Sequence, residues 1–218
     1  MRITRSILAF LIVAVMFAVP ALIAVWNTGQ LELHGWMNRH HPGWADRFFA
    51  AFTHVADGLV PTGLALLLLA FKDVRSFLMM GLSCGLSAIV VQFLKRSVFA
   101  DHHRPAMFQE QLQDLHWVQG IELHHHYSFP SGHSTAAFAM CLALAVIINR
   151  TSWAVALAFM AVLLAYSRVY LSQHFTEDIL AGAALGTVTA LLVQQVLYTG
   201  RPSSKPWMDR RLFPAQNQ

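Results

Sequence analysis

Residues 153–178 read WAVALAFMAVLLAYSRVYLSQHFTED, and this stretch decides which fold the chain can adopt. Trp153–Tyr170 is an apolar run whose one charged residue, Arg168, stands near its end, and a second apolar run follows the short connection Leu171–Thr176. Crossing the ~30 Å hydrocarbon core of a bilayer takes about 20 helical residues. No strand-like alternation is present, so segments that lie in lipid must be helices. The stretch predicts two membrane helices joined by a tight polar turn.

The rest of the chain repeats this pattern of apolar runs and polar connections. Of the 218 residues, 56% are hydrophobic and 12% are charged, which is too apolar for an ordinary soluble domain. The predicted spans are Ile7–Trp26, Phe48–Phe71, Ser76–Leu94, Ser131–Ile148, Trp153–Tyr170 and Glu177–Tyr198. We therefore expect an all-α integral membrane bundle of six transmembrane helices. It forms a single domain over residues 1–218, with a core at about 48–198 and a cytoplasmic tail at 199–218. The first run could be a cleaved signal peptide, but its length favours a retained helix.

The placement of Lys and Arg predicts how these helices are oriented. With the N-terminus inside, the cytoplasmic side collects Arg2, Arg5, Lys72, Arg75, Arg150, Arg201, Lys205, Arg210 and Arg211. We expect a multi-pass protein of the plasma (inner) membrane with both termini in the cytoplasm. The net charge of +4 would also suit a nucleic-acid binder, but the basic residues are scattered among apolar runs. No nucleic-acid partner is expected.

Three polar blocks stand at the outer ends of the predicted helices, and the topology brings them to one membrane face. They are Lys95 with Arg104-Pro105, Pro130-Ser131-Gly132-His133, and Ser167-Arg168 with His174 and Asp178. Their cationic members suit a phosphoryl group, because its transfer depends mainly on positioning and charge stabilisation. Lys95, Arg104 and Arg168 can supply that charge. Ser131 and Gly132 open a helix, whose free N–H groups favour an anion.

The remaining members of these blocks can carry acid–base and nucleophilic chemistry. His174 and Asp178 stand four residues apart at a helix start, so the carboxylate can fix the imidazole tautomer and leave the other nitrogen free to attack. His133 can protonate the leaving oxygen. The expected intermediate is a phosphohistidine, which water later hydrolyses.

Pro130-Ser131-Gly132-His133 and Ser167-Arg168-x5-His174-x3-Asp178 resemble the second and third signature motifs of the type 2 phosphatidic acid phosphatase superfamily, in its bacterial membrane lipid phosphatase branch. Lys95…Arg104-Pro105 looks like the first motif, although eight residues separate Lys95 from Arg104 where the family usually has six. The excess predicts a longer turn and leaves Lys95 and Arg96 as alternatives, with Lys95 favoured. The resemblance covers roughly residues 84–190.

The resemblance implies a metal-independent phosphatase without a cofactor, on a six-helix membrane core. It implies His174 as nucleophile, Asp178 as its partner and His133 as general acid. It further implies that phosphate is bound by Lys95, Arg104, Ser131, Gly132 and Arg168.

The expected function is hydrolysis of a lipid phosphate or diphosphate, such as undecaprenyl diphosphate, phosphatidylglycerol phosphate, phosphatidic acid or lipid A. A lipid phosphotransferase would share every motif. An ion or proton transporter would need charged residues through the bilayer depth, whereas here they gather at one face. A soluble haloperoxidase of the same superfamily is disfavoured by the hydrophobicity. The chain is expected to be a monomer or a weak homodimer among membrane lipids.

Other polar and small residues allow two readings each. His102-His103 and His124-His125-His126 could suggest zinc, but no Cys or carboxylate set accompanies them at zinc spacing, so a pH-responsive loop is favoured. His54 and Asp57 either are functional or mark the outer end of the second span. The pairs Gly81-x3-Gly85 and Gly182-x3-Gly186 allow close helix contact, within the bundle rather than in a dimer.

Overall fold

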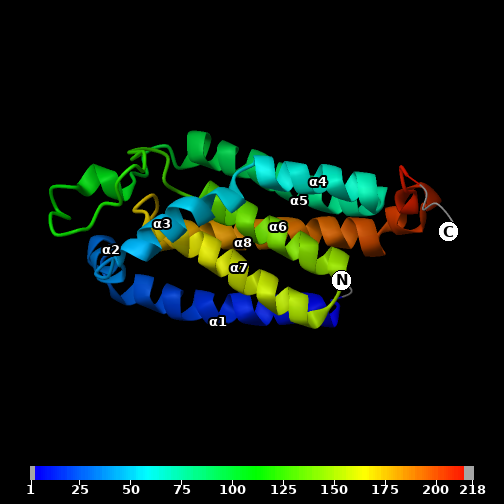
Figure 1. The fold of residues 1–218 in the computed structure, drawn as a ribbon, viewed down its shortest axis with the longest axis horizontal. Helices are drawn as coiled ribbons and strands as arrows, with labels where there is room; N and C mark the ends of the chain where they lie inside the picture. Colours follow the sequence, from blue (N-terminus) through cyan, green and yellow to red (C-terminus); the bar gives the residue numbers. More distant parts are fainter. Residues whose placement is uncertain (1–2, 214–218) are drawn as a thin grey trace.

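The computed structural model of the chain describes residues 3–213, and within this range it contains helices and no strand, which confirms the predicted all-α class. The α-helices are α1 (Arg5–Asn27), α2 (Gln30–Met37), α3 (Gly43–Phe52), α4 (Leu59–Phe71), α5 (Val74–Phe93), α6 (Gly132–Ile148), α7 (Thr151–Tyr170) and α8 (Thr176–Gln194). Shorter turns are η1 (Thr53–Ala56), η2 (Leu94–Val98), η3 (Pro105–Phe108), η4 (Gln195–Thr199), η5 (Arg201–Ser204) and η6 (Pro206–Asp209). The long helices run side by side along one axis (Figure 1).

Four described helices are long and apolar enough to cross a membrane: Arg5–Asn27, Val74–Val98, Thr151–Tyr170 and Thr176–Thr199. A fifth span is possible if Gly43–Ala56 and Leu59–Phe71, bent by 51° at their junction, are taken as one. The remaining predicted span, α6, has only 17 residues. It packs against α5, α7 and α8 and is buried along most of its length, so it needs little lipid contact. A count of six spans therefore stays a prediction.

Two glycines on α8 let this helix approach α6 closely. A Cβ built on Gly182 would lie 2.4 Å from the carbonyl oxygen of Ser131, and one on Gly186 would lie 2.3 Å from that of Thr135. Any larger residue would push the two helices apart. The predicted contact of this glycine pair within the bundle is confirmed, whereas a Cβ on Gly81 or Gly85 would meet nothing within 4 Å.

One end of the bundle is covered by α2 and by the loop that joins η2 to α6 (Figure 1). Helix α2 lies in a segment for which the sequence predicted no helix. Its His34 is buried against the α7–α8 turn, where Nε2 lies 3.1 Å from Ser172 Oγ and the ring packs edge-on to Phe175. This covered end holds all three polar blocks. Helix α1 begins, and η6 ends, at the opposite end of the bundle (Figure 1).

Candidate active site

The α7–α8 turn places His174 directly beside Asp178. His174 Nδ1 lies 3.2 Å from Asp178 Oδ2, and both side chains are almost fully buried. The same Oδ2 accepts the N–H of Phe175 at 2.9 Å and the hydroxyl of Ser128. Because Oδ2 only accepts, Nδ1 of His174 must carry the hydrogen, and Nε2 is left with its lone pair. The imidazole therefore has the tautomer that a nucleophile requires.

The charge state of His174 agrees with this tautomer. Burial lowers its pKa well below the usual value, and the positive charges of Arg104, Lys95 and Arg168 lower it further. The ring is neutral at neutral pH and can act as a nucleophile. The three predicted cations, which come from three separate segments, thus all lower the pKa of one histidine.

Each of these cations is oriented by an oxygen of another segment. Lys95 Nζ donates to the Tyr127 carbonyl at 2.9 Å, and Arg104 donates to the carbonyls of His126 and Gln173 at 2.9 and 3.1 Å. Arg168 donates through Nη1 to Thr53 Oγ1 at 2.7 Å, while its buried Nε has no partner within residues 3–213. A buried guanidinium with an unused donor can bind an additional anionic oxygen.

The π-helical turn η2 gives Lys95 and Arg96 different surroundings. Phe99 N donates to Leu94 O at 2.8 Å, so the helix end is widened by one residue. Lys95 is buried and its charge lowers the pKa of His174, whereas Arg96 is exposed. The histidine-rich segment contributes backbone carbonyls, since those of His125 and His126 accept bonds from Arg104.

His133 is held from the side by an aspartate whose role the sequence left open. Asp57, just after η1, lies with Oδ1 2.9 Å from His133 Nε2 and with Oδ2 2.7 Å from His54 Nδ1. This carboxylate can stabilise a protonated His133 and fix which ring nitrogen faces away from it. Its identification needed the bend between α3 and α4, which brings Asp57 beside the start of α6.

Ser131 and Gly132 lie at the N-terminus of α6, as predicted, but much of Ser131 is used by the fold. Its hydroxyl caps the helix through Ser134, and its N–H donates to the Asp178 carbonyl at 2.9 Å. The groups left for an anion at this helix end are the N–H groups that follow Ser131. Thr53, Ser128 and Gln173 are polar neighbours of the site that carry no sequence signal of their own.

Two cavities flank these residues. One, of about 370 Å³, is lined by Gln92 of α5 and by Lys95, Arg96, Arg104 and His124–Tyr127. The other, of about 230 Å³, is lined by Asp57 and His133 and by residues of α5 and α6 that include Cys84, Ala88 and Ala136. The site thus has a cationic side under the loop and a largely apolar side toward the bundle surface.

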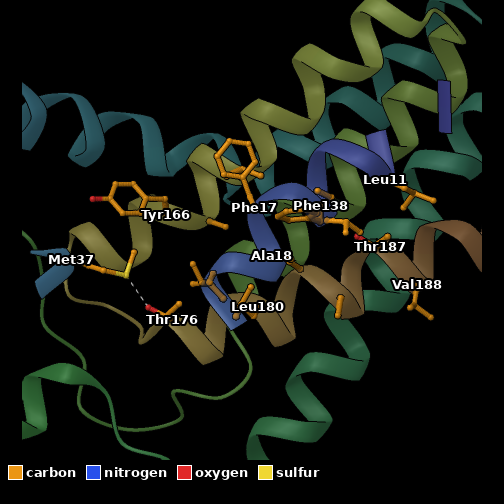
Figure 2. A pocket seen from close by; sticks show the side chains of 18 residues that line it. Leu11, Phe17, Ala18, Met37, Phe138, Tyr166, Thr176, Leu180, Thr187 and Val188 are labelled. Atoms are coloured by element: carbon orange, nitrogen blue, oxygen red, sulfur yellow. Dashed lines mark hydrogen bonds between the residues drawn. The ribbon is translucent and has the colours of Figure 1, made fainter. Parts of the chain in front are cut away.

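A third cavity, of about 360 Å³, is apolar and lies between α1, α7 and α8. Figure 2 shows residues of α1 and α8 that line it, among them Leu11, Phe17, Leu180 and Thr187, with Thr176 close to Met37 at one end. On α8 it is lined by Ile179 and Ala183, while Asp178 and Gly182 face α6. This cavity lies on the side of α8 away from the histidines.

Comparison with known proteins places these residues in a family context. Residues 76–201 match the PAP2 superfamily, and they include every residue of the three polar blocks. An undecaprenyl-diphosphatase of Sulfolobus acidocaldarius is 35% identical over 74 residues, which cover 34% of this chain and 35% of that protein. A lipid A 1-phosphatase of Rhizobium etli is 37% identical over 93 residues, covering 40% and 39%. The matched segment spans only about a third to two fifths of each relative.

Two crystal structures share the arrangement of helices. Aquifex aeolicus LpxE aligns with a TM-score of 0.68 and 27% identity, over 77% of this chain and 96% of that one. A transmembrane PAP2-type phosphatidylglycerolphosphate phosphatase from Bacillus subtilis aligns with a TM-score of 0.50 and 20% identity, over 89% and 96%, which is a likeness of fold. From the match across residues 76–201, the shared fold and the three motif blocks gathered around His174, we conclude that this chain belongs to the PAP2 superfamily.

Proposed function

We propose that the protein is a multi-pass membrane phosphatase that removes phosphate from a lipid phosphate or diphosphate through a phosphohistidine. The observation that carries the proposal is the buried His174–Asp178 pair, whose free nitrogen lies in the field of three cations. The curated relatives named above act, by their names, on undecaprenyl diphosphate and on lipid A, which makes these the first substrates to test. Phosphatidylglycerol phosphate and phosphatidic acid complete the set.

In the first step, Lys95, Arg104 and Arg168 bind the phosphoryl oxygens and neutralise their charge. Nε2 of His174 attacks phosphorus, a P–N bond forms, and the P–O bond to the lipid breaks. Because Nε2 of His133 faces Asp57, the proton for the leaving oxygen comes from Nδ1 of the protonated ring. Asp178 stabilises the cation that develops on His174.

In the second step, His133 takes a proton from water, which attacks the phosphohistidine. The P–N bond breaks, inorganic phosphate is released, and His174 returns to its starting tautomer. Every step uses groups of this chain, so we propose that the chemistry needs no metal ion.

The lipid is proposed to enter from the side of His133. The leaving oxygen must lie next to the general acid, and the cavity lined by His133 is also lined by apolar side chains of α5 and α6. The apolar cavity of Figure 2 lies beyond α8 and serves as a control. Ala88→Leu should raise the KM for a long-chain substrate severalfold, whereas Ala184→Leu, at an equally exposed alanine of the control cavity, should leave it unchanged. Equal effects would refute the proposed entry side.

The central experiment measures phosphate release by protein purified in detergent, with each candidate lipid and with EDTA present. His174→Ala should abolish turnover, and Gln113→Ala, at an exposed loop position outside the cavities described above, should not. Acid-labile, base-stable 32P on the wild-type chain would identify the phosphohistidine. Full turnover by His174→Ala would refute the nucleophile. Transfer of phosphate to an added lipid alcohol, instead of its release, would identify a phosphotransferase.

The site is proposed to face the outside of the plasma membrane, with both termini in the cytoplasm. The α4–α5 connection, which carries Lys72, and the start of α7, which follows Arg150, lie at the other end of the bundle (Figure 1). A cysteine introduced at exposed Gln109, in the loop over the site, should react with a membrane-impermeant maleimide in intact cells. Labelling only after lysis would reverse the orientation.

A further inference from the structure

A cluster of metal-binding side chains lies outside the proposed phosphate site. His41, Asp46 and His116 each offer a ligand atom, and these atoms all lie within 4.8 Å of one another. His41 precedes α3, Asp46 is in its first turn, and His116 belongs to the loop between η3 and α6. Nδ1 of His41 lies 3.2 Å from Asp46 Oδ1, and Nε2 of His116 lies 2.9 Å from Asp46 Oδ2.

The hydrogen bonds around His41 determine which ring nitrogen faces Asp46. Nε2 of His41 lies 3.1 Å from Asn38 Oδ1. The orientation of that amide is fixed, because Asn38 Nδ2 donates to the carbonyls of His34 and Val169 at 3.0 and 3.2 Å. Nε2 must therefore carry the ring hydrogen, so in the neutral ring Nδ1 presents a lone pair to a carboxylate oxygen. Two acceptors at 3.2 Å need a proton or a metal ion between them.

A metal ion can supply positive charge for both histidines at once, because all three ligand atoms lie within 4.8 Å of one another. The His41 side chain is 3% exposed, and the centroid of the His116 ring lies 4.7 Å from that of His41. One divalent ion placed between the two rings would bind a lone pair of each imidazole and an oxygen of the Asp46 carboxylate. Ligands of tetrahedral zinc, at about 2.0–2.2 Å from the metal, lie roughly 3.3–3.6 Å from each other. The His41–Asp46 separation of 3.2 Å is close to this range, and the His116–Asp46 separation of 2.9 Å is shorter.

The surrounding side chains orient the three ligands as in metal sites. Asn38 accepts the ring N–H of His41, and the hydroxyl of Tyr170 donates to Asp46 Oδ1 at 2.7 Å. Ligating histidines commonly donate their second N–H to an oxygen, and ligating carboxylates are themselves hydrogen-bonded. Two imidazoles and one carboxylate are a donor set that suits zinc.

We propose that His41, Asp46 and His116 bind a structural zinc ion that fastens the loop over the active site to α3 and to the end of α7. The same loop carries Arg104, and α7 carries Arg168. The zinc takes no part in phosphoryl transfer, so this inference does not rest on the proposed function. It differs from the histidine-run site considered in the sequence, because neither His102-His103 nor His124–His126 takes part.

The test uses the full chain in detergent, purified without a polyhistidine tag. Elemental analysis should find about one zinc per chain, and adding Zn²⁺ to chelator-treated protein should raise its Tm by roughly 5 °C. His116→Gln keeps a hydrogen bond to Asp46 but loses a ligand, so it should lose both zinc and the Tm shift. His116→Cys, which restores a zinc ligand, should recover them, and His124→Ala should behave like the wild type. Zinc at wild-type stoichiometry in His116→Gln, or no zinc and no shift in the wild type, would overturn the proposal.

The effect of EDTA on activity also tests whether this zinc takes part in the reaction. Phosphate release by His116→Gln should be insensitive to EDTA, because its zinc is already absent. Complete loss of its activity with EDTA would contradict the metal-free mechanism and leave the zinc site to be judged by stoichiometry and Tm.

Discussion

The contact between α6 and α8 can be tested by adding one methyl group. In Gly182→Ala the new Cβ would lie 2.4 Å from the Ser131 carbonyl oxygen and 3.1 Å from Ser134 Cβ and Thr135 Oγ1. The first of these atoms is backbone and cannot rotate away. Reaching an ordinary contact of 3.4 Å requires α8 and α6 to separate by about 1 Å at this level.

That separation would displace residues of the proposed site. Gly182 stands one turn after Asp178, and the Ser131 N–H···O=C Asp178 bond of 2.9 Å joins the two helices there. A displacement of about 1 Å in a positioned group can lower the rate about a hundredfold. Overpacking costs roughly 1–3 kcal/mol of stability, offset by about 1 kcal/mol from the better helix propensity of alanine. We expect kcat/KM to fall about 10²-fold and Tm to fall by a few degrees.

The assay compares Gly182→Ala with Gly85→Ala, the same exchange at a helical position where a Cβ meets nothing within 4 Å. Both variants are purified in the same detergent, and steady-state phosphate release and thermal unfolding are measured. Gly85→Ala should keep wild-type kinetics and an equal or higher Tm. If Gly182→Ala matches it in both rate and Tm, then the α6–α8 contact does not position the site.

Three further outcomes follow from individual side chains. Asp57→Asn removes the charge that faces His133 at 2.9 Å, so kcat for phosphate release should fall about tenfold; an unchanged kcat would remove Asp57 from the reaction. Arg168→Lys replaces a guanidinium, whose Nη1 bonds Thr53 and whose Nε has no partner in the described residues, with a single ammonium group. In the same assay kcat/KM should fall about 10²-fold, and a tenfold increase in substrate concentration should not restore the rate. Burial lowers the pKa of His34 from 6.5 to about 4, so the unfolded chain binds its proton first as the pH falls. The contribution of His34 to the free energy of unfolding should be fully present above pH 6.5 and should decrease by up to about 3 kcal/mol toward pH 4, which a falling Tm would show. His34→Gln should flatten that pH dependence. An equally steep curve in the variant would exclude His34 as its source.

Much of the fold could be predicted from hydropathy, because lipid imposes long apolar helices whose ends are polar. The boundaries of α1, α5, α7 and α8 agree with the predicted spans to within a few residues. Helix α2 was not predicted, since its eight residues, QLELHGWM, mix polar and apolar side chains without a clear face. Its stability comes from packing against the α7–α8 turn.

In the site, contacts within one helical turn could be predicted from the sequence, whereas contacts between distant segments could not. His174 and Asp178 share one turn, so their spacing predicts their contact. Asp57 could not be assigned, because its contact with His133 joins positions 76 residues apart through the bend after η1. The cluster of His41, Asp46 and His116 has no local motif either, since it forms only when the loop folds back over α3.

The carboxylate of Asp178 serves two purposes through one oxygen atom. Its Oδ2 accepts the Phe175 N–H that starts α8 as well as the His174 ring. A descendant of this protein that no longer needed the reaction would still be selected to keep the aspartate, because the helix begins on it. An intact Asp178 is thus weak evidence that a related chain is an enzyme. Loss of activity over evolution should show first at His174 or His133, whose side chains cap no helix.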